Sequence, residues 1–268
     1  MIESCRLHYN EKGNSNDNIV IVHGLFGSSD NWVTIGRRLS ENHHVYMVDQ
    51  RNHGHSPHCK PHSYETMKED LVRFFNDHMI NKATLIGHSM GGKTVMAFAA
   101  DYPELVDKLI VVDIAPKNYM LIGEKKQHQL IIQALKGLRN DYTSRQEIAA
   151  FINNRINDLD VTLFILKSFY RNKKTGKFDC RLNLDALDES LDSIVGDVDA
   201  GWFAGKQPAN YPVLFIRSEK SGYISDNDIP VIRKIYPDAV IETISGAGHW
   251  LHAEQPEQFL KVLKNFIL

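Results

Sequence analysis

The chain has 268 residues, of which 43% are apolar and 24% charged, and its formal net charge is −2. This length and composition suit a globular protein whose core needs neither disulfides nor metal ions. The chain lacks the basic charge that would attract nucleic acid, and it contains no apolar run long enough to span a membrane. We therefore expect its partners to be neither nucleic acids nor membranes.

The cysteines and the first residues bear on the cellular compartment. Cys5, Cys59 and Cys180 are widely spaced and follow no metal-binding pattern, which argues against a disulfide framework or a zinc site. The N-terminus lacks the cationic and apolar segments of a signal peptide. We expect a cytoplasmic protein.

Apolar runs of strand length alternate with stretches of helical periodicity along most of the chain. Residues 2–10 alternate weakly, as an edge strand does. Buried strands are predicted at 19–22, 45–48, 85–86, 109–112, 213–216 and 240–244, and helices at 31–40, 64–79, 90–101, 226–236 and 256–267. The alternation predicts a mostly parallel sheet with helices on both faces.

Residues 117–206 interrupt this alternation between two strands. Apolar stretches at 130–132, 148–152 and 163–166 have helical surroundings, and 173–177 is typical of a turn. We interpret 117–206 as a helical cap inserted over the carboxyl edge of the sheet, where α/β proteins bind ligands. Residues 1–116 and 207–268 are then the two parts of the core. The alternative is a separate helical domain with a structural role.

A nucleophile elbow is the most specific motif. The sequence Gly87-His88-Ser89-Met90-Gly91 follows a β-forming run and precedes a helical stretch, which is the context that the pattern requires. The turn exposes the Ser89 hydroxyl at the edge of the sheet, and glycines flank it because side chains would collide there. We predict that Ser89 is a nucleophile.

An ester-hydrolysing elbow needs two backbone donors for the developing oxyanion. One is the N–H of Met90, the residue after the nucleophile. The other comes from an early loop, here His23-Gly24-Leu25-Phe26-Gly27, and Leu25 is our candidate. We expect His23 to hold this loop by a hydrogen bond rather than to act in catalysis.

The general base is predicted in Gly246-Ala247-Gly248-His249-Trp250, after the last strand. A neutral imidazole that titrates near physiological pH suits the role, and the order of serine before histidine fits this architecture. His249 is therefore our candidate base. We expect His252 to be structural or to support the site indirectly, and His88 to pack beneath the elbow.

The acid departs from the common pattern of capped hydrolases. The loop that usually supplies it reads Arg217-Ser218-Glu219-Lys220-Ser221-Gly222-Tyr223 and has serine where aspartate is expected. Asp113 instead ends the strand that follows the elbow helix, and we predict that it holds the imidazole. Ser221 is a possible auxiliary partner and Glu219 the fallback acid. Alternatively, Asp113 only stabilises the turn before Pro116.

Five motifs, taken together, resemble a known family. They are His23-Gly24-Leu25-Phe26-Gly27-Ser28, Asp49-Gln50-Arg51-Asn52-His53-Gly54-His55-Ser56, Gly87-His88-Ser89-Met90-Gly91-Gly92-Lys93, Asp113-Ile114-Ala115-Pro116 and Gly246-Ala247-Gly248-His249-Trp250. The set resembles the YbfF-type esterases of the α/β-hydrolase superfamily, above all in Lys93 and in the motif that begins at Asp113. The similarity runs from about residue 6 to the C-terminus.

The resemblance implies an α/β-hydrolase fold with a helical cap and a serine esterase without cofactor. It also implies the acid at Asp113 and a serine in the usual acid loop. We expect small to medium acyl esters as substrates, with acyl-CoA thioesters as a possible further class. A C–C bond hydrolase or cofactor-free haloperoxidase would use the same residues, and a non-catalytic ligand-binding protein is the other alternative. The sequence contains no phosphate-binding glycine loop and no His-Glu-x-x-His metal motif.

Overall fold

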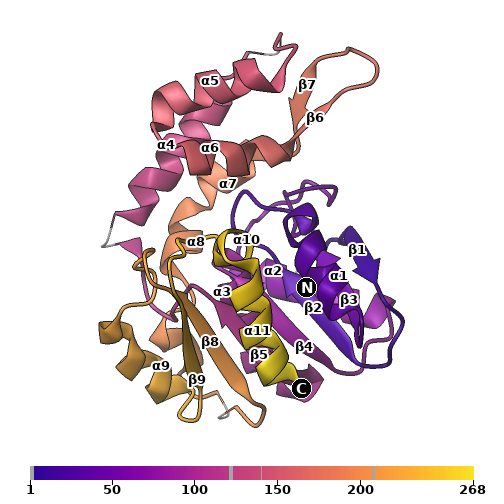
Figure 1. The fold of residues 1–268 in the computed structure, drawn as a ribbon, viewed down its shortest axis with the longest axis vertical. Coiled ribbons are helices and arrows are strands. Elements are labelled where there is room, and N and C mark those ends of the chain that lie inside the picture. Colours follow the sequence, from indigo (N-terminus) through magenta and orange to yellow (C-terminus); the bar gives the residue numbers. More distant parts are fainter. Residues whose placement is uncertain (1–2, 121–122, 140, 207–208) are drawn as a thin grey trace.

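The computed structural model describes residues 3–120, 123–139, 141–206 and 209–268. Seven strands form one sheet in the order β1-β3-β2-β4-β5-β8-β9 (Figure 1). They are β1 (Tyr9–Lys12), β2 (Asn18–Val22), β3 (His44–Val48), β4 (Ala83–His88), β5 (Val106–Val112), β8 (Val213–Ser218) and β9 (Val240–Ile244). Only β1 pairs antiparallel with its neighbour, so the mostly parallel sheet expected from the sequence is confirmed.

Helices cover both faces of the sheet because its buried strands are apolar on both sides. In β2, Ile19 and Ile21 face α1 (Val33–Leu39) and α11 (Pro256–Ile267), whereas Val20 and Val22 face the opposite cluster. That second cluster includes residues of α2 (Tyr64–Asp77), α3 (Met90–Asp101) and α9 (Ile229–Ile235). The short helix α10 (Leu251–Glu254) leads into α11. Single 3₁₀ turns lie at Ser29–Trp32, Pro103–Leu105, Leu166–Ser168, Ala200–Phe203 and Asp226–Asp228.

The segment between β5 and β8 lies beyond one end of the sheet (Figure 1). It contains α4 (Glu124–Lys136), α5 (Arg145–Ile156), α6 (Leu159–Ile165), β6 (Phe169–Arg171), β7 (Phe178–Cys180), α7 (Leu184–Glu189) and α8 (Leu191–Gly196). The helices α4, α5 and α6 overlap the three apolar stretches that were expected to be helical, whereas α7 and α8 were not predicted. The β6–β7 hairpin has its turn at 173–177, as expected, but its two strands were not predicted, because strands of three residues are too short to show an alternating pattern.

Cys5 and Cys59 form a disulfide, although 54 residues separate them in sequence. The expectation that the cysteines argue against disulfide bonding is therefore wrong for this pair. Spacing alone could not reveal it, because the loop after β3 folds back onto the segment before β1. Buried hydrogen bonds join the same two segments, since Asp70 accepts from the backbone N–H of Cys5 and from the Arg51 guanidinium.

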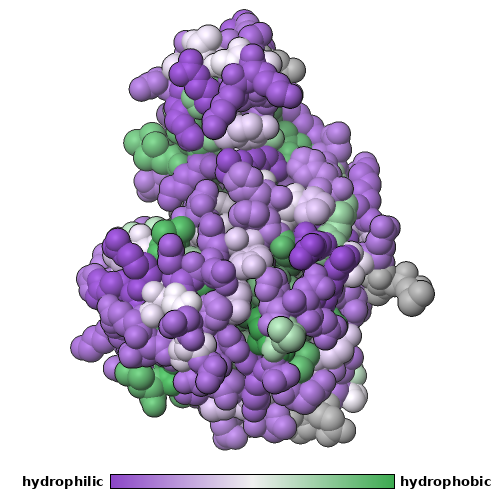
Figure 2. All heavy atoms as spheres, turned by 90° about the vertical axis from the view of Figure 1, so that its right-hand side faces the viewer, coloured by the Kyte–Doolittle hydropathy of each residue, from purple (hydrophilic) through white to green (hydrophobic). Residues whose placement is uncertain are grey.

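The outer surface carries no broad apolar area on the face shown in Figure 2, where hydrophobic residues form small, separate groups. Within the described ranges, no helix combines the length and the apolar character needed to cross a bilayer.

Candidate active site

Ser89 lies in the sharp turn between β4 and α3. Its backbone has φ 53° and ψ −120°, a conformation that is costly for a residue with a Cβ. A Cβ on Gly91 would lie 2.3 Å from the backbone oxygen of Val22, and one on Gly87 would lie 2.3 Å from that of Gly91. The glycines therefore allow the turn that the motif predicts. It is held by the Ser89 N–H, which donates to the Val112 backbone oxygen at 3.0 Å.

Asp113 and His249 meet at the same edge of the sheet. Asp113 follows β5 and is buried, and its Oδ2 lies 2.9 Å from Nδ1 of His249 in the loop after β9. The other neighbour of the carboxylate is Ser218, whose N–H donates to Oδ1 at 3.0 Å and whose hydroxyl donates to Oδ2 at 3.3 Å. A buried carboxylate held in this way can fix the imidazole with Nε2 available for proton transfer.

Ser218 makes the contact that we expected from Ser221. Ser221 donates its N–H to the Ser218 hydroxyl at 3.1 Å and accepts from the Tyr223 N–H at 3.3 Å. Its bonds thus reach Asp113 only through Ser218. Glu219, the fallback acid, is exposed and accepts from the backbone N–H of Gly246 at 2.7 Å. Sequence reasoning missed Ser218, although a hydroxyl at the end of the strand next to β5 was an available signal.

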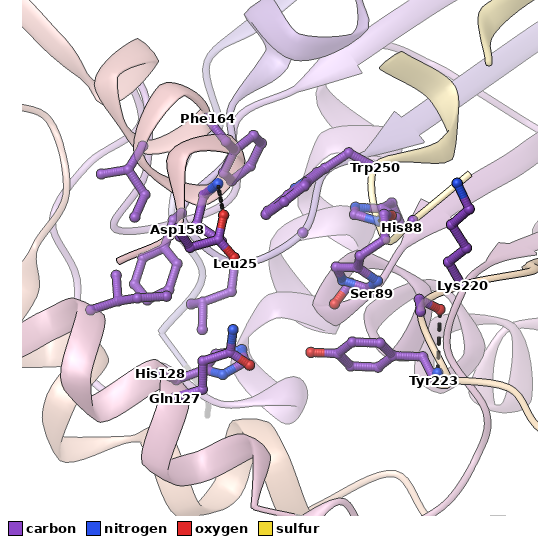
Figure 3. A pocket seen from close by; sticks show the side chains of 18 residues that line it. Leu25, His88, Ser89, Gln127, His128, Asp158, Phe164, Lys220, Tyr223 and Trp250 are labelled. Atoms are coloured by element: carbon purple, nitrogen blue, oxygen red, sulfur yellow. Dashed lines mark hydrogen bonds between the residues drawn. The ribbon is translucent and has the colours of Figure 1, made fainter. Parts of the chain in front are cut away.

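Ser89 and His249 line one cavity of about 370 Å³ (Figure 3). No hydrogen bond joins the two side chains among the described contacts, and such bonds are often long until a substrate is bound. Phe164 and Trp250 lie on one side of Ser89, and the Tyr223 ring stacks on the His249 imidazole at 4.0 Å between centroids. Asp158 and Lys220 lie on opposite sides of the cavity in Figure 3.

Of the two predicted oxyanion donors, Leu25 lines this cavity, and Met90 lines a smaller cavity that Leu25 and Ser89 also line. Met90 begins α3, and the first N–H groups of a helix have no intrahelical acceptor. Leu25 lines the cavity beside Ser89, and a Cβ on Gly24 would lie 3.1 Å from the Ser89 Cβ, so this loop passes very close to Ser89. The N–H groups of the neighbours Phe26 and Gly27 are bonded to His53 and Gly24, whereas that of Leu25 makes none of the hydrogen bonds described here.

Four histidines around the site are buried and take supporting positions. His23 contacts its own loop at the Gly24 oxygen and accepts from the Gln50 N–H, and burial lowers its pKa. His88 bonds the His249 backbone oxygen at 2.8 Å. His252 stacks on Trp32 with 4.1 Å between centroids, and burial lowers its pKa to about 3. His53 accepts from the Phe26 N–H at 3.2 Å. These positions favour neutral structural imidazoles rather than bases.

Comparisons with known proteins agree with the architecture. The family model described as "alpha/beta hydrolase fold" matches residues 17–256. Esterase YbfF of Escherichia coli is 38% identical, over 94% of each chain, and an sn-1-specific diacylglycerol lipase of Danio rerio is 34% identical, over 97% of this chain and 80% of the relative. The solved structure of a marine microorganism esterase superposes with a TM-score of 0.91 at 41% identity, covering 98% of this chain and 99% of the other.

Proposed function

The chain belongs to the alpha/beta hydrolase family, among relatives that are esterases and lipases, and we propose that it is a serine esterase for small to medium acyl esters. One observation carries the proposal. The His249 imidazole is held at 2.9 Å by the buried Asp113 carboxylate, in the cavity that the strained Ser89 also lines. A serine, a histidine and a carboxylate in these places are the parts of an acyl-transfer triad.

In the proposed reaction, Ser89 Oγ attacks the ester carbonyl while His249 takes the hydroxyl proton. Asp113 keeps the imidazole in the required tautomer and stabilises its protonated form. The N–H groups of Leu25 and Met90 stabilise the oxyanion of the tetrahedral intermediate. His249 then protonates the leaving alcohol, and an acyl-enzyme remains on Ser89. A water molecule activated by His249 hydrolyses that intermediate.

Acyl-CoA thioesters are a further candidate substrate class. The turn between β6 and β7 carries Lys173, Lys174 and Lys177, and none of them forms an ion pair within the described part of the chain. Such a turn could attract phosphate groups. A cytoplasmic location is a separate proposal, against which the Cys5–Cys59 disulfide stands, because such bonds are rare in a reducing compartment. Cell fractionation tests it.

The direct test is covalent labelling of Ser89 by a fluorophosphonate, followed by a hydrolysis screen. We expect labelling of the wild-type chain, its loss in Ser89→Ala, and hydrolysis of short esters. Labelling without hydrolysis of any ester or thioester would favour a C–C hydrolase or haloperoxidase activity. Absence of both would favour a non-catalytic ligand-binding protein.

A further inference from the structure

Lys93 lies one helical turn beyond Ser89 in α3 and is almost completely buried. No carboxylate of the residues that the structure describes makes a hydrogen bond with it. Its ammonium donates to three backbone oxygens, those of Lys117 at 2.9 Å, Val195 at 3.4 Å and Asp197 at 2.5 Å. An ammonium has three N–H groups, so these contacts occupy all of them. Lys93 therefore has no N–H group left to bind a substrate. Any effect of Lys93 on the reaction must come from the backbone segments whose position its hydrogen bonds fix.

The three oxygens belong to the two ends of the 117–206 segment. Lys117 opens the segment after β5, and Val195 and Asp197 lie at the end of α8, before the chain returns to β8. One further bond connects the same ends, because the Tyr119 N–H donates to the Val195 oxygen at 3.1 Å. The second end is also held by α2, where the Tyr64 hydroxyl donates to the Ile194 oxygen at 2.7 Å. A single side chain on the nucleophile helix thus ties down both ends.

A chamber of about 30 Å³ lies between the elbow and these two ends, with room for roughly one or two methyl-sized groups. Ser89 and Met90 line it from the elbow, and Tyr119, Ile194 and Val195 line it from the held segments. His249 lines the large cavity but not this chamber. Because the general acid must reach the leaving oxygen, the alcohol has to lie in the large cavity, which leaves the chamber for the acyl group.

We propose that Lys93 is a positioning residue that fixes both ends of the 117–206 segment against the nucleophile helix and so sets the width of the acyl chamber. The inference rests on the proposed esterase reaction. An apolar side chain would avoid the cost of burying an ammonium but would leave three carbonyl groups without this donor. Lysine at this site therefore fixes the position of the backbone segments that line the acyl chamber, at the cost of some stability of the fold.

The test compares Lys93→Met with Lys108→Met. Lys108 is a matched control, because its ammonium also bonds backbone oxygens, those of Phe266 and Ile267, at the far end of the sheet. The readout is the ratio of kcat/KM for an acetyl and a hexanoyl ester of one alcohol, which does not depend on the fraction of active protein. We expect Lys93→Met to lower this ratio at least tenfold, because the chamber widens, and Lys108→Met to leave it within twofold.

Two measurements separate this role from general damage. Labelling of Ser89 by a small fluorophosphonate should stay within about twofold in Lys93→Met, since the elbow and His249 are untouched. Proteolysis within 117–206 should become several-fold faster in Lys93→Met than in Lys108→Met. An unchanged ester ratio together with unchanged proteolysis overturns the proposal. A wild-type chain that is neither labelled nor active instead overturns the esterase function, and proteolysis then still tests the role of Lys93 in holding the segment.

The wild-type protein supplies a test that needs no folded variant. Burial lowers the pKa of Lys93 to about 7, and the neutral amine has only two donors for three carbonyls. The ester ratio should therefore fall between pH 6 and pH 8.5, and any effect of pH that is common to both substrates cancels in the ratio. Other titratable or charged groups also face Lys93 or the chamber, namely Lys117, Asp197, Asp199, Tyr64, Tyr119, Tyr223 and His128. A fall that persists in His128→Gln supports Lys93, and a constant ratio contradicts it.

Discussion

Ser218 contacts Asp113 twice, once through its backbone N–H and once through its hydroxyl, so each carboxylate oxygen receives one bond from the same residue. Removal of the hydroxyl in Ser218→Ala leaves the backbone bond in place. We expect kcat to fall about tenfold, the effect of about 1.4 kcal/mol, because Oδ2 then holds only His249. Steady-state kinetics with a short ester tests this. A loss as large in Ser221→Ala would show that the Ser221 hydroxyl, which bonds Tyr223, is equally important.

Ser89 and His249 should behave as one unit. Neither residue can form the attacking alkoxide without the other, so we expect Ser89→Ala, His249→Ala and the double variant to lose similar amounts of kcat/KM. The measurement is a double-mutant cycle on ester hydrolysis. If the loss of kcat/KM in the double variant equals the product of the two single losses, the two residues act independently, which would contradict the prediction.

The assignment of the acid is tested by a pair of isosteric changes. Asp113→Asn should fold normally and lower kcat by several orders of magnitude, because the amide favours the wrong imidazole tautomer. Glu219→Gln should change kcat by less than twofold, since Glu219 is exposed and bonds the Gly246 backbone. If Glu219→Gln is the damaging change, the acid has been assigned to the wrong residue.

Buried histidines should make the fold sensitive to acid. Burial lowers the pKa of both His62 and His252 to about 3, whereas histidine in the unfolded chain titrates near 6.5. Between these values the unfolded chain binds more protons, so stability falls as pH falls, by up to about 1.4 kcal/mol per pH unit for each group. Urea unfolding of His62→Gln at pH 7, 6 and 5 should show a shallower pH dependence than wild type. His58→Gln, at an exposed position, is the control.

The basic turn between β6 and β7 is tested by charge removal. Replacement of Lys173, Lys174 and Lys177 by glutamine should raise KM for an acyl-CoA and weaken its salt dependence, because screening acts over roughly 8–10 Å at ordinary ionic strength. Hydrolysis of an uncharged ester of the same acyl length should hardly change. An equal response of both substrates would show that the turn is only part of the surface.

The parallel core was predictable because its strands are continuous apolar runs, and the meeting of Ser89, Asp113 and His249 followed from strand ends that share one edge of a sheet. The roles of these residues stay predictions until the variants are measured. Contacts between segments that lie far apart in the sequence were not predictable. The disulfide between Cys5 and Cys59 and the bonds from Lys93 to both ends of the 117–206 segment depend on where distant segments arrive in space.

Because the proposed acid, Asp113, directly follows β5, the loop after β8 does not have to supply a carboxylate. That loop would ordinarily supply the acid, but here Lys220 and Ser221 line the cavity, and neither side chain bonds Asp113 among the described hydrogen bonds. In the proposed enzyme, substitutions at these two positions can therefore change which substrates are accepted without removing a proton-transfer group. Specificity could then evolve, or be engineered, in a part of the chain that the chemistry does not constrain.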